Sequence, residues 1–177
     1  MALLGVAGAA PAGATVIEHE RFSETDSFTD TECGFTLQVQ STASGQTLLR
    51  VDNGGQAFLQ HTNVRFRDVA TNPETGRSFV IRGHVLYNDV KATQISDTVY
   101  EFVAVEAGQP FVIEDAAGQV IVRDRGVIRH TFLFDTLGDS QPGGVFLVET
   151  DTAVHGPHPG FSPDFPFCEI AAELTGA

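Results

Sequence analysis

The sequence has no Trp, a single Lys and only 10 basic residues among 177, against 23 acidic ones. The formal net charge is therefore −13. So few cations argue against a nucleic-acid-binding protein, because phosphate contacts need clustered Lys and Arg, and against docking on anionic lipid. Charged residues make up only 19% and hydrophobic residues 42%, which excludes a charge-driven disordered chain.

Familiar functional motifs are also missing. After the amino terminus, no stretch reaches the roughly 20 apolar residues that span a bilayer. The chain lacks the HExxH, EF-hand, CxxC and GxSxG patterns. The glycine pairs at 54–55 and 143–144 lie in turn clusters without a helix to receive a phosphate. We therefore expect no metal, no cofactor and no membrane span, and whether the protein is an enzyme stays open.

The first 14 residues, MALLGVAGAAPAGA, are small and apolar and carry no charged side chain. They are typical of the apolar region and small-residue cleavage site of a secretory signal peptide, with Ala12-Gly13-Ala14 at the cleavage point. We expect residues 15–177 to form a single secreted domain. The positively charged start of a signal peptide is missing, so a disordered tail on a cytosolic protein is the alternative.

Two cysteines, Cys33 and Cys168, lie 135 positions apart. An even pair behind a leader predicts one structural disulfide in an extracellular protein. Closing so long a loop could stabilise the fold by about 5 kcal/mol in the chain-entropy model.

The rest of the chain consists of β-rich runs between turn clusters, without heptads or a long 3.6-residue period. Turns are expected at 52–55, 71–76 and 115–118, and one short helical turn at 169–174. The expected strands are 16–22, 34–40, 47–51, 57–69, 78–87, 98–106, 110–114, 119–124, 126–136 and 144–154.

This order of elements predicts an all-β protein, because strands do not alternate with helices. Consecutive long hairpins favour an antiparallel β-barrel of about eight to ten strands. A two-sheet sandwich is the alternative. A Cys33–Cys168 bond suits a barrel in which the first strand closes against the last.

Three phrases carry a family resemblance: TNPETGRSFVI, RDRGVIRHTF, and GPHP followed by FPFC. Together they extend over the last two-thirds of the expected mature chain and resemble secreted actinobacterial proteins with a small β-barrel domain. In strand count the chain is also similar to the allene oxide cyclase and lipocalin barrels. The resemblance implies a barrel fold and no assigned activity. No catalytic motif of either barrel family matches, so no functional residue is carried over.

One strand face combines a histidine with aromatic residues. His130 alternates with Phe132 and Phe134 along 126–136. Inside a barrel, His130 would orient a ligand or act as a general acid or base. The interpretation we favour is a hydrogen-bonded core histidine, or a shift of one residue that turns it outward.

The only tyrosines, Tyr87 and Tyr100, both fall in expected strands. Their hydroxyls need partners if buried, and with Gln60 and Glu101 they could form the polar floor of a pocket. The predicted ligand-binding residues are His130, Tyr87, Tyr100, Phe132 and Phe134, and no catalytic residue is assigned.

Two charge patterns, Arg65-Phe66-Arg67-Asp68 and Arg123-Asp124-Arg125, each place two arginines on one strand face. This arrangement suits an anion clamp for a carboxylate or sulfate. We favour ordinary pairing with acids on neighbouring strands, at less than about 1 kcal/mol per pair.

The close histidine pair His155 and His158 would suit zinc or copper if Asp151 or Asp164 joined it. Histidines in a Pro-rich loop are more often turn residues that bond to backbone carbonyls. We therefore assign no metal site.

Three functions are compatible with these observations. The first is a secreted β-barrel that binds a small, largely apolar ligand. The second is a cofactor-free cyclase or isomerase that uses the same cavity. The third is a non-catalytic surface protein that binds a partner protein. The first two require an interior void of several hundred Å³, on the order of known ligand pockets, and the third an exposed apolar patch.

Overall fold

The computed structural model describes residues 15–52 and 54–177, so the expected leader at 1–14 lies outside the described residues. The prediction of an all-β protein is confirmed. The elements are β1 (Thr15–Asp30), β2 (Leu37–Val51), β3 (Phe58–Thr71), β4 (Ser78–Gln94), β5 (Val99–Glu114), β6 (Val120–Arg123), β7 (Gly126–Asp135), β8 (Val145–His155), the 3-10 helix η1 (Pro159–Phe161) and the helix α1 (Phe167–Thr175).

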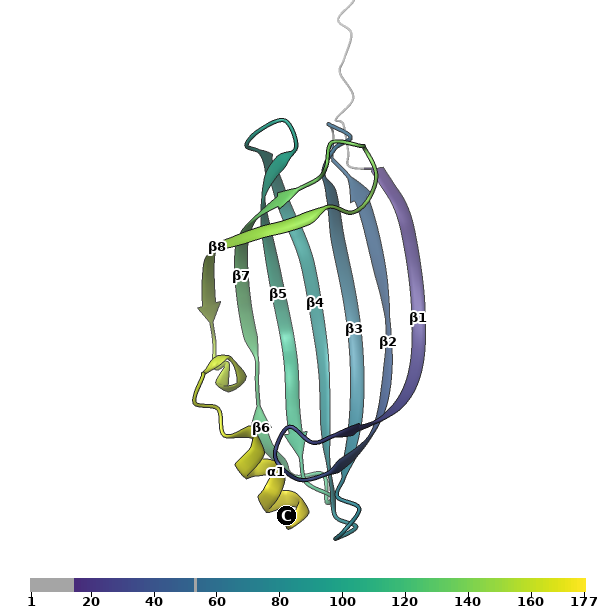
Figure 1. Ribbon diagram of the computed structural model, residues 1–177, viewed down its shortest axis with the longest axis vertical. Helices are drawn as coiled ribbons and strands as arrows, with labels where there is room; N and C mark the ends of the chain where they lie inside the picture. Colours follow the sequence, from purple (N-terminus) through teal and green to yellow (C-terminus); the bar gives the residue numbers. More distant parts are fainter. Residues whose placement is uncertain (1–14, 53) are drawn as a thin grey trace, which may run out of the picture.

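All eight strands belong to one antiparallel sheet with the order β1-β2-β3-β4-β5-β7-β8, and β6 lies beside β5. Figure 1 shows this curved sheet, with β1 at one edge and β8 at the other. The sheet is not closed, so the prediction of a barrel is wrong. The alternative of a two-sheet sandwich is wrong as well, because the described strands form a single sheet.

Strand direction explains why the two edges do not meet as an antiparallel pair. The path from β1 to β8 contains seven strands, and each is antiparallel to its neighbour. The first and last strands therefore run in the same direction. An up-and-down barrel closes with antiparallel pairs only when its strand number is even.

The sheet has two faces with different roles. We call the side that carries Leu37, Phe79 and Ile113 the helix face, because α1 packs against it through Ala171. The opposite side, which carries Arg65 and its cross-strand neighbours, is the open face. Between its ends, β2 presents only Ser41, Ala43, Gly45 and Thr47 to the helix face. These small side chains leave the middle of the face without a large apolar core.

Apolar packing is concentrated at the two ends of the helix face. At one end, α1 covers a buried cluster of Leu37, Val39, Ala70, Phe79 and Ile113. At the other end, Ala57, Tyr100 and Phe102 are buried beneath Phe132 and Phe134. In Figure 1 the β7–β8 hairpin bends across the sheet at this second end.

The predicted disulfide between Cys33 and Cys168 is confirmed. It ties the β1–β2 connection to α1, with the two Cα atoms 5.1 Å apart. Among the described residues, no helix is long and apolar enough to cross a membrane.

The turn predictions agree with the structure where it describes them. The amide of Gly76 bonds to Asn72 O at 2.8 Å in the β3–β4 connection. In the β5–β6 hairpin, the Asp115 carboxylate accepts the amides of Ala117 and Gln119 at 2.9 and 2.8 Å. The expected helical turn at 169–174 is part of the longer helix α1.

The two histidines of the close pair, His155 and His158, do not form a common binding site. His158 Nδ1 bonds to Asp124 Oδ1 at 2.5 Å, and both side chains are almost fully buried. Asp124 sits in the break between β6 and β7, and its other oxygen accepts the Gly160 amide at 3.1 Å. The contact between His158 and Asp124 therefore holds the C-terminal segment against the sheet.

Candidate functional site

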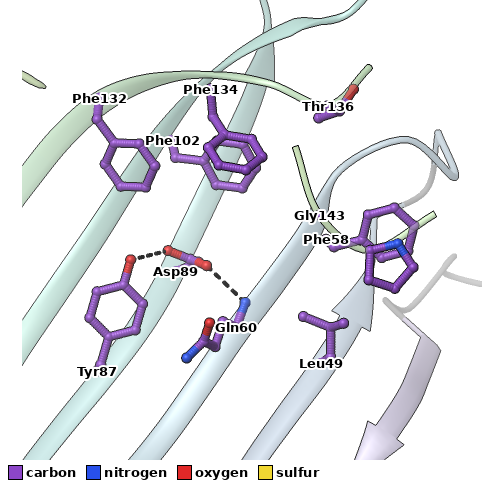
Figure 2. A pocket seen from close by; sticks show the side chains of 11 residues that line it. Leu49, Phe58, Gln60, Tyr87, Asp89, Phe102, Phe132, Phe134, Thr136 and Gly143 are labelled. Carbon is purple, nitrogen blue, oxygen red and sulfur yellow. Dashed lines mark hydrogen bonds between the residues drawn. The ribbon is translucent and has the colours of Figure 1, made fainter. Parts of the chain in front are cut away.

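A pocket of about 410 Å³ opens on the helix face at the end covered by the β7–β8 hairpin. It lies between β2–β5 on one side and β7 with the β7–β8 loop on the other. Figure 2 shows its lining residues. The lining residues are Leu49, Phe58, Gln60, Tyr87, Asp89, Phe102, Phe132, Phe134, Thr136, Pro142 and Gly143.

One wall of the pocket is aromatic because alternate positions of β5 and β7 face the same side. Phe102 and Phe132 are directly opposite across these strands and stack with ring centroids 5.5 Å apart. Phe134 meets Phe102 edge-on at 5.8 Å. Offset and edge-on contacts of this kind are the preferred arrangements of aromatic pairs. This wall of the pocket is therefore apolar.

The opposite side of the pocket is polar (Figure 2). The Tyr87 hydroxyl donates to Asp89 Oδ1 at 2.9 Å, and the backbone amide of Gln60 donates to Asp89 Oδ2 at 2.8 Å. Asp89 is only 6% exposed. Burial raises the pKa of its carboxyl, although the two hydrogen bonds act in the opposite direction. The pKa of Tyr87 is also raised, first by burial and then by the Asp89 charge.

The loop between β7 and β8 covers the mouth of the pocket. Thr136 anchors its start, because both its amide and its hydroxyl donate to Thr98 O, at 2.8 and 3.0 Å. At its end, Gly144 has φ +136, and a Cβ there would collide with Phe134. A glycine is therefore required where the loop passes closest to the aromatic wall.

The polar side offers mainly hydrogen-bond acceptors to a ligand. The single hydroxyl proton of Tyr87 is used on Asp89, which leaves the phenolic oxygen as an acceptor. The Gln60 side-chain amide donates one of its two N–H groups to Thr62 Oγ1 at 2.8 Å, which leaves its carbonyl oxygen as an acceptor and its second N–H as a donor. With the Asp89 oxygens, these groups suit a ligand whose polar end donates hydrogen bonds.

The predicted ligand-binding residues separate into two groups. Tyr87, Phe132 and Phe134 line the pocket. Tyr100 lies beneath it in the buried cluster with Phe102 and is only 3% exposed, and burial raises its pKa. His130 is on the same face but does not line the pocket.

His130 is instead part of a separate polar contact at the sheet edge. Its Nδ1 lies 2.7 Å from Glu149 Oε1, and Glu149 also accepts the Thr152 hydroxyl at 2.5 Å. These two contacts, Thr152 first, lower the pKa of Glu149. Of the two companions proposed for the tyrosines, Gln60 lines the pocket, whereas Glu101 lies opposite Leu133 on the open face.

Sequence reasoning missed Asp89, which is the central polar residue of the pocket. A usable signal was present: Asp89 follows Tyr87 by two positions, so a strand places both on one face. Phe58, Leu49 and the loop residues were missed because they come from segments whose distance from β7 depends on the bend of the hairpin.

Within the described residues, no group of three or more His, Cys, Asp or Glu side chains is arranged to hold a metal ion. No protein-family model, curated protein or solved structure matches this chain. The resemblance to secreted actinobacterial barrel proteins therefore stays an expectation.

Proposed function

We propose that the protein binds a small, largely apolar molecule in the pocket on the helix face, with an alcohol or amine group of the ligand against Asp89. The observation that carries this proposal is one buried carboxylate facing a wall of three phenylalanines. Ligand pockets typically combine a large apolar lining with a few converging polar groups, at volumes of about 300–1,000 Å³. The disulfide supports secretion, since such bonds persist in oxidising compartments.

Asp89 defines the class of ligand. An ionised carboxylate inside an apolar pocket repels a fatty-acid carboxylate and attracts a hydroxyl or an ammonium group. We therefore expect long-chain primary alcohols and amines to bind, and the carboxylic acid of equal chain length to bind much more weakly.

Displacement of an environment-sensitive apolar dye tests the proposal. Leu49→Trp should fill the pocket and weaken alcohol binding by about tenfold or more, since tenfold is only 1.4 kcal/mol. Leu48→Trp is the matched control, because Leu48 is the adjacent residue of β2 and faces the open side opposite His61. The proposal fails if the wild-type protein binds neither alcohol nor amine, or if both variants bind equally well.

Proton transfer in the same pocket is a second candidate, favoured by the raised pKa of Asp89. A buried carboxyl with a raised pKa is suited to act as a general acid or base in a cofactor-free isomerase or cyclase. An apolar α,β-unsaturated ketone incubated in deuterated water should then exchange protons next to its carbonyl group. Exchange with the wild type but not with Asp89→Asn would support catalysis, and no exchange with either would leave a binding protein.

The third candidate, a partner-binding surface, has a feature of its own. The start of edge strand β8 exposes four consecutive apolar residues, Val145–Val148, each between 47% and 57% accessible. Exposed apolar edge strands are potential pairing sites. Light scattering over a range of protein concentrations would show association if this edge binds a second chain.

A further inference from the structure

The charges of strands β1 to β3 are separated between the two faces of the sheet. On β1, Glu20, Glu24 and Asp26 lie on the helix face, opposite small residues of β2. Although acids outnumber bases by 23 to 10, the arginines gather on the other side. The arginines that the strand register places on the open face are Arg21, Arg50, Arg65, Arg67, Arg82, Arg123 and Arg129.

The expected pairing of Arg65 and Arg67 with acids on neighbouring strands is not found. Arg65 lies opposite Ser44 and His84, and Arg67 lies opposite Thr42 and Arg82. Both arginines are exposed. Within residues 15–52 and 54–177, the only Arg–carboxylate ion pair joins Arg82 to Glu114, with 2.6 Å between Nη2 and Oε1.

The neighbouring acid, Asp68, cannot compensate because it points to the helix face, where it accepts the Ser41 hydroxyl at 2.6 Å.

A direct Arg–Arg cross-strand pair is unfavourable, because like charges opposite each other repel. Here a single carboxylate, that of Glu114, interacts with several guanidinium groups. The hydrogen bond from Arg82 lowers the pKa of Glu114, and the charges of Arg67 and Arg123 lower it further. The cluster therefore keeps an excess of positive charge, which an anion would relieve.

Shallow hollows lie between these arginines. Three of them, of about 300, 250 and 310 Å³, share Arg65 in their linings. The second hollow also includes Arg21 and Asn63, and the third includes Arg82 and His84. Together they extend from β1 to β5, so the surface suits an extended ligand more than a single small ion.

Polar side chains continue this surface in register across the strands. Ser23, Ser44, Arg65, His84 and Gln109 are successive cross-strand partners from β1 to β5. Neighbouring strands are about 4.8 Å apart, so this row offers a hydrogen-bonding group at each step. A polymer lying across the strands would meet hydroxyl, guanidinium, imidazole and amide groups in turn.

We propose that this surface, the Arg65 groove, binds an acidic polysaccharide whose uronate or sulfate groups contact Arg65 and Arg67. Guanidinium groups recognise carboxylate and sulfate oxygens through paired hydrogen bonds. The register places the described aromatic strand residues on the helix face, so the groove has no stacking platform for nucleic-acid bases.

Calorimetric titration at low ionic strength tests this proposal with defined probes. The probes are polygalacturonate for uronate, heparin for sulfate, neutral dextran, and duplex DNA. We expect binding of polygalacturonate, heparin or both, a decrease in affinity with added salt, and no binding of dextran. Arg65→Ala should weaken binding by about tenfold, and Arg65→Lys should restore part of it, because a lysine keeps the charge but loses the planar fork.

Arg129→Ala is the matched control. Arg129 is exposed on the same face but lies on β7, outside the three hollows. The Arg129→Ala variant loses the same charge as Arg65→Ala but keeps the three hollows intact. Its affinity should therefore stay within about twofold of the wild type. Circular dichroism would confirm that each variant is folded. Three results would overturn the proposal: no binding of either acidic polysaccharide by the wild type, an equal loss in both alanine variants, or binding of dextran or DNA as tight as that of the acidic polysaccharides.

Discussion

Tyr87 and Asp89 lie two positions apart on β4, and the phenol of the first donates a 2.9 Å hydrogen bond to the carboxylate of the second inside an apolar pocket. This pair lines the pocket and is largely buried, and burial makes the charge of Asp89 costly to the fold. Burial raises the pKa of both groups.

Asp89→Asn should change how stability depends on pH. Because the pKa of Asp89 is higher in the folded than in the unfolded chain, its ionisation weakens folding as the pH rises through the folded value. Below the unfolded pKa this penalty is absent. The variant should therefore gain stability relative to the wild type as the pH rises above about 4, where the carboxyl of the unfolded chain ionises, by about 1.4 kcal/mol for each unit of pKa shift.

Urea unfolding of both proteins over this range measures the effect. Asp97→Asn, which removes the same charge from an exposed acid outside the pocket, is the matched control. A constant difference between wild type and Asp89→Asn would mean that Asp89 titrates normally.

Removal of the disulfide should destabilise the protein strongly. The bond joins positions 135 residues apart and holds α1 on the sheet. Its loss therefore increases the conformational entropy of the unfolded chain and releases the C-terminal segment in the folded one. We expect Cys33→Ser with Cys168→Ser to lower the free energy of unfolding by about 2–5 kcal/mol. Thermal unfolding with and without reductant checks this, because reductant should affect the wild type and leave the double variant unchanged.

Gly83→Ala should destabilise the sheet although the substitution adds one methyl group. Phe66 lies directly opposite Gly83 on β3 and its ring covers the glycine, so a Cβ would collide with this ring and with Pro110 O. We expect a cost of about 1–3 kcal/mol. Gly54→Ala is the control, because the nearest atom to its Cβ is 3.4 Å away on Asp52. Equal denaturation midpoints for the two variants would contradict the collision.

Asp124→Ala should loosen the C-terminal segment. The substitution leaves the buried His158 Nδ1 and the Gly160 amide without their acceptors. Losing the partner of a buried polar group costs about 1–3 kcal/mol. Hydrogen exchange should then rise at 156–177 more than in β2 and β3. Asp164→Ala, an exposed acid in the same segment, should leave the exchange unchanged.

The sequence predicted the strands well where side chains alternate and turns are marked. The 71–76 turn and the Asp115 hairpin agree with the structure because their Gly, Asn and Asp residues encode the turn locally. The joining of 34–40 and 47–51 into β2 was missed, because the small residues between them carry no alternation and are held by the flanking strands β1 and β3.

The candidate site was only partly predictable for a similar reason. The facing of Phe132 and Phe134 follows from strand period alone. The exclusion of His130 does not, because it depends on where along β7 the hairpin bends across the sheet. Closure failed as a prediction because β6 and β7 both pair with β5, so the path contains seven strands and its two edge strands run in the same direction.

The disulfide also sets an order of events during synthesis. Each strand in the path pairs with the one before it, so the sheet can grow by adding hairpins as the chain emerges. Cys168, however, follows all eight strands. Cys33 can therefore bond to Cys168 only after all eight strands have been synthesised, and this oxidation joins the two ends of the fold.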